Sequence, residues 1–188
     1  MLHRLSAAWA RIELICAAAL AGLVTLLILL NVVTRSMRLA LYWVDEAAIY
    51  AMVLMTFLAA SAAIERRESI SITLVMDLMR PRVRTAFWLF VDLITALAAV
   101  LLVWFTWRWF DPVTLARVGF DFRAFQGETF NFIYAEPTST LGFRKFWVWL
   151  IMPVFALGLL LHATSNLIKT LRGQTPNAPD PADKEREP

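Results

Sequence analysis

The sequence is poor in the residues that most cofactor and catalytic sites require. Its 188 residues include one cysteine, two histidines and six glycines. The single Cys16 excludes an intramolecular disulfide and a cysteine metal cluster, and His3 and His162 alone do not supply the paired ligands of a membrane haem. The glycines form no phosphate-binding loop, and no GxSxG elbow supports a serine hydrolase built on Ser61 and His162. We therefore expect no enzyme activity, no cofactor and no metal site.

Charge is also scarce, whereas apolar residues dominate. Charged residues make up 18% of the chain and hydrophobic residues 60%, with a mean hydropathy of +0.62. A soluble domain of this size has too little polar surface to cover such a composition, so we expect an integral membrane protein surrounded by lipid. The net charge of +3 comes from basic residues that lie beside apolar runs. Because these residues form no stripe on a soluble face, we expect no nucleic-acid partner.

Long apolar runs predict an all-α bundle of four transmembrane helices, over residues 12–33, 44–64, 85–109 and 146–168. The first run is expected to be retained rather than cleaved, because its Ala-rich patch comes before the end of the apolar core. Residues 68–84 are too charged to span and predict a short interfacial helix or turn that stops near Pro81. Residues 111–145 form a long periplasmic loop, and residues 169–188 read as a disordered cytoplasmic tail.

The long loop has an aromatic pattern. Its aromatic residues alternate at period two on both sides of Gln126 and Gly127: Phe120, Phe122, Phe130, Phe132 and Tyr134. This alternation favours a small hairpin with one aromatic face. The face would either dock on a partner or rest on the membrane surface, and the sequence does not choose between these two.

Two residues of the fourth apolar run stand out. Pro153 predicts a bend, since proline removes a backbone donor from the helix. His162 is expected to be a packing or interface residue rather than a proton relay, because the sequence shows no second titratable group beside it.

Basic residues predict the orientation in the membrane. Four spans place both termini on one side, and that side collects most of the cations: Arg4, Arg11, Arg66, Arg67, Arg80, Arg82, Arg84, Lys169, Arg172, Lys184 and Arg186. The other side has fewer, spread over more chain: Arg35, Arg38, Arg117, Arg123, Arg144 and Lys145. By the positive-inside rule both termini are cytoplasmic.

Six residues are candidates for a partner interface or a structural role: Trp43, Asp45, Glu46, Arg66, Arg67 and Asp92. Asp45 and Glu46 either fix the second span by hydrogen bonds or Arg pairing, within this chain or with a partner, or simply begin a helix whose dipole favours acids. Asp92 lies inside the third span, where a carboxylate is costly unless it faces protein or water. A structural hydrogen bond is favoured for Asp92 over a functional ion site.

Three short motifs occur in order around the first two spans. Asn31-Val32-Val33-Thr34-Arg35 ends the first span, Tyr42-Trp43-Val44-Asp45-Glu46 begins the second, and the second ends with Ala62-Ala63-Ile64-Glu65-Arg66-Arg67-Glu68-Ser69-Ile70. In this order and spacing they resemble the DctQ-type small membrane subunit of tripartite ATP-independent periplasmic (TRAP) transporters. Asp45 replaces the first acid of that family's W-x-E-E pattern, and Ser69 stands where the family often has histidine.

The resemblance implies a function and a set of partners. It implies a scaffold subunit in the bacterial inner membrane that supports a large permease subunit, which takes up a small solute, typically an organic acid, by ion symport. A periplasmic solute-binding protein would deliver that solute. The competing hypothesis from the residues alone is a self-sufficient four-helix channel or carrier with Asp92 as its ion site.

Overall fold

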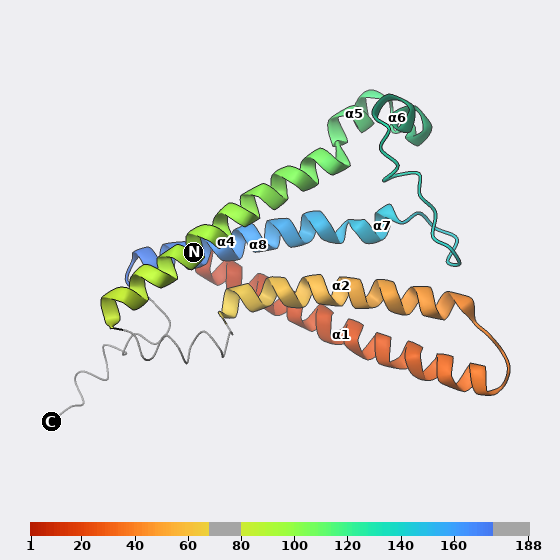
Figure 1. The fold of residues 1–188 in the computed structure, drawn as a ribbon, viewed down its shortest axis with the longest axis horizontal. Helices are drawn as coiled ribbons and strands as arrows, with labels where there is room; N and C mark the ends of the chain where they lie inside the picture. Colours follow the sequence, from red (N-terminus) through yellow and green to blue (C-terminus); the bar gives the residue numbers. More distant parts are fainter. Residues whose placement is uncertain (68–79, 175–188) are drawn as a thin grey trace.

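The computed structural model describes residues 1–67 and 80–174, which are mostly helical (Figure 1). The helices are α1 (Leu2–Ser36), α2 (Tyr42–Arg66), α4 (Pro81–Phe110), α5 (Pro112–Arg117), α6 (Phe122–Thr129), α7 (Phe146–Trp149) and α8 (Ile151–Leu171). Four helical stretches are long and apolar enough to cross a membrane. The predicted all-α fold with four transmembrane helices is therefore confirmed.

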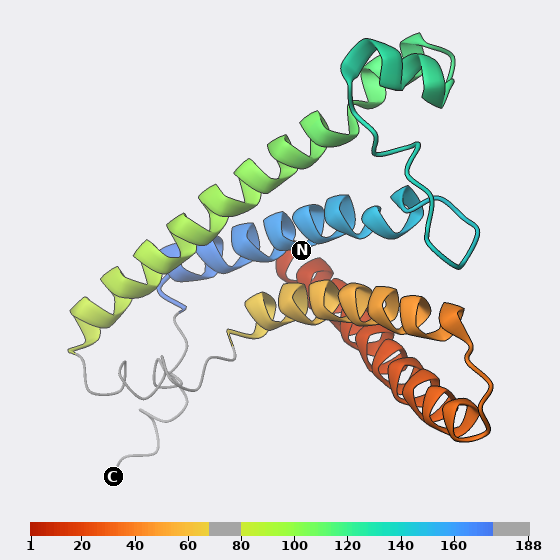
Figure 2. The same ribbon diagram turned by 45° about the vertical axis from the view of Figure 1, so that its right-hand side comes forward.

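The four long helices run alternately up and down. We call the end that holds the start of α1 and the end of α8 the terminal end, and the opposite end, which carries α5 and α6, the loop end (Figure 1). Helix α1 packs along α2 and α4 packs along α8, while α8 also contacts α1 and α2. Towards the loop end α4 diverges from the α1–α2 pair (Figure 2). Helix α8 therefore connects two arms, and it is the most buried of the four spans.

Small side chains line the helix contacts. Ala62, Ala99, Ala156 and Ala163 are at most 1% exposed. Small residues let helix backbones approach closely. In lipid the hydrophobic effect does not drive helices together, so such close packing is the usual basis of their association. Large apolar residues point outward instead, as expected where the surrounding solvent is hydrocarbon. The helices thus pack through small residues and present their large ones to the membrane.

Three helices extend clearly beyond the predicted spans. Helix α1 begins at Leu2, so the polar start of the chain is helical as well. Pro81 is the first residue of α4, so residues 81–84 belong to that helix and not to an interfacial segment. Proline suits this position because it lacks only a donor that the first turn leaves unused. Helix α8 continues to Leu171, beyond the predicted start of the tail. Residues 68–79 and 175–188, where the interfacial segment and the rest of the tail were predicted, lie outside the described residues.

The fourth span is interrupted near its start. Helix α7 ends at Trp149 and α8 begins at Ile151, so the break lies at Leu150, just before Pro153. Pro153 has no N–H to donate to the carbonyl of Trp149, and the next bond, from the Val154 amide to the Leu150 carbonyl, is long at 3.4 Å. The weakened bonding therefore loosens the turn ahead of the proline.

The predicted hairpin in the long loop is wrong. Two short helices stand there instead, and an aspartate caps the start of each. Asp111 accepts a hydrogen bond from the Thr114 amide at 3.2 Å, and Asp121 accepts one from the Arg123 amide at 2.8 Å. Capping satisfies amides that a helix start leaves unpaired, so these local bonds outweigh the period-two pattern.

The loop helices enclose a small aromatic core of their own. Phe110, Phe125 and Tyr134 are buried there, and Phe122 stacks on Tyr134 with ring centroids 5.4 Å apart. Burial raises the pKa of Tyr134, so its hydroxyl stays protonated and donates to the carbonyl of Phe110 at 2.6 Å. The remaining aromatic residues of the pattern are exposed: Phe120, Phe130 and Phe132. The alternating aromatics therefore divide between core and surface and do not form a single face.

Candidate functional site

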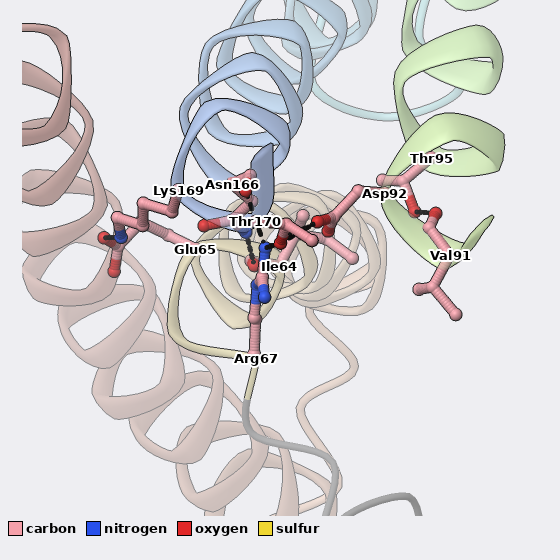
Figure 3. Close-up of polar contacts among 9 residues, drawn as sticks. All are labelled: Ile64, Glu65, Arg67, Val91, Asp92, Thr95, Asn166, Lys169 and Thr170. Atoms are coloured by element: carbon pink, nitrogen blue, oxygen red, sulfur yellow. Dashed lines mark hydrogen bonds and ion pairs between the residues drawn. The ribbon is translucent and has the colours of Figure 1, made fainter. Parts of the chain in front are cut away.

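A buried ionic cluster joins three helices at the terminal end. Arg67 follows α2 in the left-handed conformation, with φ of 53°, and its guanidinium reaches between α8 and α4 (Figure 3). Its Nη2 lies 2.7 Å from Asp92 Oδ2 on α4. The same nitrogen donates to the Asn166 carbonyl at 2.8 Å and to Thr170 Oγ1 at 2.9 Å, both on α8. One side chain thus holds α2, α4 and α8 together.

This ion pair is almost completely removed from solvent. The side chains of Arg67 and Asp92 are only 9% and 6% exposed. Thr170 donates a further hydrogen bond to Asp92 Oδ2 at 2.5 Å, and the guanidinium lies 5.0 Å from the centre of the Trp88 ring. Charges removed from water are tolerated when they are paired and hydrogen-bonded in this way. Asp92 therefore has both a hydrogen-bond donor, Thr170, and a counter-ion, Arg67, within this chain.

A second buried cluster joins α1 to α8. His162 Nε2 lies 3.0 Å from Glu13 Oε2, and His162 Nδ1 lies 2.8 Å from Ser6 Oγ. All three residues are at most 1% exposed. The expectation that no titratable group stands beside His162 is wrong, because Glu13 contacts its ring. Glu13 is 149 residues away in sequence, so the neighbouring residues of His162 gave no sign of it. Ser6, Ala10, Glu13 and Ala17 recur at spacings of four and three, and this buried face is the signal that would have revealed the partner.

Gly158 permits the close contact beside this cluster. A Cβ atom at Gly158 would lie 2.7 Å from Glu13 Oε1, 2.8 Å from Ser61 Oγ and 3.0 Å from Trp9 Nε1. Polar atoms from α1 and α2 thus rest directly on the backbone of α8. Ser6, His162 and Glu13 have the connectivity of a hydrolase triad, but Ser6 is fully buried, so a substrate has no access to it. The cluster is suited to fixing helix positions.

At the loop end an ion pair joins α1 to α2. Arg35 Nη2 lies 2.8 Å from Asp45 Oδ2, and Arg35 Nε donates to Asn31 Oδ1 at 3.0 Å. Asn31 also donates to Asp45. The side chains of Arg35 and Asp45 are 63% and 44% exposed, so solvent weakens this pair relative to the one at the terminal end.

Glu46 holds the loop that precedes α7. Its carboxylate accepts hydrogen bonds from three successive backbone amides, those of Ser139 at 2.8 Å, Thr140 at 2.6 Å and Leu141 at 3.2 Å. The hydroxyls of Thr140 and Tyr50 also donate to it, at 2.6 Å and 2.9 Å. Successive amides that converge on one anion form a nest, which favours a carboxylate at its centre. Glu46 therefore ties α2 to a segment more than 90 residues later in the chain.

The remaining two candidates have different surroundings. Trp43 is 42% exposed, and Arg66 is also exposed. The Trp43 ring, at the start of α2, is therefore accessible to lipid or to a partner, in keeping with the preference of tryptophan for membrane interfaces.

A family model for the DctQ component of tripartite ATP-independent periplasmic transporters matches residues 24–173. The chain belongs to the DctQ family. The suspected resemblance is thereby confirmed, and with it the role of a TRAP transporter component. No curated protein matches the chain significantly.

The region matched by the DctQ model contains most of the polar contacts between helices. Asn31, Arg35 and Asp45, from two separate motifs, meet in one cluster, and Arg67 from the third motif pairs with Asp92. Glu13 lies before the matched residues, so the α1–α8 cluster includes a residue that the DctQ model does not cover. Among the described residues, no group of three metal-ligating side chains is present.

Proposed function

We propose that this DctQ-family chain is the scaffold subunit of a TRAP transporter, supporting a large permease subunit that takes up a small organic acid by ion-gradient-driven symport. A periplasmic solute-binding protein delivers the solute. The chain spans the bacterial inner membrane with both termini in the cytoplasm, as its basic residues indicate.

One observation carries this proposal: the buried ionisable groups of the described chain contact one another across helices. Arg67 pairs with Asp92, and Glu13 pairs with His162. A carrier needs polar groups at the midplane that are available to an ion or solute, commonly on broken helices. In this chain the corresponding groups are used to hold α1, α2, α4 and α8 in place, which suits a fixed support.

The competing function, a self-sufficient channel or carrier with Asp92 as ion site, meets a specific obstacle. The Arg67 guanidinium already lies 2.7 Å from the Asp92 carboxylate, and Thr170 donates to the same oxygen. A transported cation would have to displace this internal cation and leave it buried without a counter-ion, which is costly. The geometry therefore favours the scaffold.

Uptake by reconstituted vesicles tests the proposal. Vesicles that contain this chain, the large permease subunit and the binding protein should accumulate solute when an ion gradient is imposed, and vesicles that lack either membrane subunit should not. Uptake by this chain alone would contradict the scaffold function and support the carrier.

A second test concerns the pair Asp45 and Glu46. Both bind residues of this chain at the loop end, where they shape the surface next to Trp43. We expect the double variant Asp45→Ala/Glu46→Ala to reduce co-purification with the permease and to reduce uptake. Unchanged co-purification and unchanged uptake would show that these acids serve neither the interface nor the scaffold.

A further inference from the structure

A basic cavity opens at the terminal end, outside the clusters described above. It has a volume of about 350 Å³ and lies between the first turn of α1 and the last turns of α8. The polar residues that line it are His3, Arg4, Ser165, Lys169, Arg172 and Gln174. None of the lining residues is acidic, and among the described residues Glu65 is the carboxylate paired with a lining cation, 3.5 Å from Lys169. The described residues that line the cavity therefore carry a net positive charge.

The start of α1 adds to this positive potential. Its first turn contains no acidic residue, and no side chain among the described residues caps its amides. Unpaired amides and the dipole of a long helix both favour an anion at this position. The helix start and the surrounding cations thus attract the same kind of ligand.

Ser165 places an unpartnered hydrogen-bond donor beside these charges. The residue is 2% exposed, lines the cavity, and its Oγ has no hydrogen-bond partner among the described residues. A buried hydroxyl without a partner is unfavourable, and an anionic oxygen that reached Ser165 Oγ from the cavity would accept its proton.

We propose that this cavity binds the phosphate group of an anionic phospholipid. A soluble phosphate compound shares that chemistry, but two features favour lipid. The cavity lies at an end of a bundle whose helices are long and apolar enough to cross a membrane, and lipid headgroups gather at the ends of such a bundle. Leu5 and Leu171, adjacent in sequence to Arg4 and Arg172, are 58% and 66% exposed and suit contact with acyl chains. The inference depends on membrane insertion and not on the permease partnership.

Native mass spectrometry of the purified full chain tests this site. Phosphatidylglycerol and phosphatidylcholine with identical acyl chains are titrated separately, and the anionic lipid should be retained selectively. Arg4→Gln and Arg172→Gln should each weaken its binding about fivefold, because each removes one cation near a headgroup. Ser165→Ala should weaken it about threefold by removing one hydrogen bond.

Two matched variants separate the site from general charge. Arg38→Gln removes an exposed cation from the loop end and should leave the affinity unchanged, and Arg172→Lys should retain most of the binding. Thermal unfolding of each variant verifies that it is folded. Equal retention of both lipids by the wild type, or a Ser165→Ala variant that binds like the wild type, would overturn the proposal. Displacement of the lipid by millimolar inorganic phosphate would overturn the lipid assignment and favour a soluble phosphate compound.

Discussion

Replacing Asp92 by asparagine tests the terminal-end ion pair most directly. The substitution preserves the size of the side chain and its ability to accept from Arg67 and Thr170 but removes the negative charge. Arg67, whose side chain is 9% exposed, then remains buried without a counter-ion. We therefore expect a marked loss of stability in a folded, correctly inserted protein.

The magnitude follows from the burial of the pair. Removing one partner of a buried ion pair costs about 3–5 kcal/mol, and the retained hydrogen bonds place Asp92→Asn near about 3 kcal/mol. For a chain of this length about 1 kcal/mol shifts Tm by about 2–4 °C, so Tm should fall by about 6–12 °C. Thermal unfolding in one detergent, followed by circular dichroism, measures this shift.

Asp45→Asn is the matched control. It makes the same chemical change in an ion pair whose side chains are 63% and 44% exposed, where the expected cost is about 0–1 kcal/mol. The double variant Arg67→Met/Asp92→Leu should be less destabilised than either single variant, because no charge is left unpaired. Equal Tm shifts for Asp92→Asn and Asp45→Asn would show that burial does not make the charge of Asp92 more important than that of Asp45.

The same variant separates the structural role of Asp92 from an ion site. At temperatures below its lowered Tm, an Asp92→Asn variant that still assembles with the permease should support normal uptake per assembled complex. Loss of uptake in a stable, assembled Asp92→Asn complex would instead point to a direct role in transport.

Three further changes test the other contacts. Glu13→Leu leaves His162 without its acceptor and should cost about 1–3 kcal/mol of stability; a Tm equal to that of the wild type would contradict the buried cluster. Glu46→Gln weakens the acceptor of three loop amides and should speed their hydrogen–deuterium exchange, with exchange in α6 unchanged as the control. Gly158→Ala places a methyl group within 3.0 Å of three polar atoms and should cost about 1–3 kcal/mol, whereas Gly22→Ala, with nothing within 4 Å, should be neutral or stabilising.

The sequence shows which charged residues would be costly inside a membrane span, but it does not show what those residues contact. Asp92 stood out because a carboxylate inside an apolar run is costly. Its partner Arg67 was also a candidate, yet the pairing depends on how α2, α4 and α8 come together. Glu13 was missed because it lies at the predicted boundary of the first span, which α1 in fact extends to Leu2.

The long loop shows a different limit. A period-two alternation of aromatic residues favours a strand, but Asp111 and Asp121 stood at helix starts and their capping bonds decided the local structure. The Asp111-Pro112 dipeptide was a readable helix-start signal. The docking of Glu46 on the backbone of residues 139–141 left no signal of this kind, because backbone amides are the same in every sequence.

Apolar runs in the sequence are enough to specify four membrane-spanning helices, and three short motifs are enough to indicate the DctQ family. The free energy of transferring a helix into lipid is approximately the sum of contributions from consecutive residues, so the composition of an apolar run decides whether it spans the membrane. The contact of Arg67 with Asp92, the contact of Glu13 with His162 and the basic cavity between α1 and α8 emerge only when the helices pack. Such contacts depend on the rotation and crossing of helices far apart in sequence, which small residues such as Gly158 permit and which no local pattern specifies.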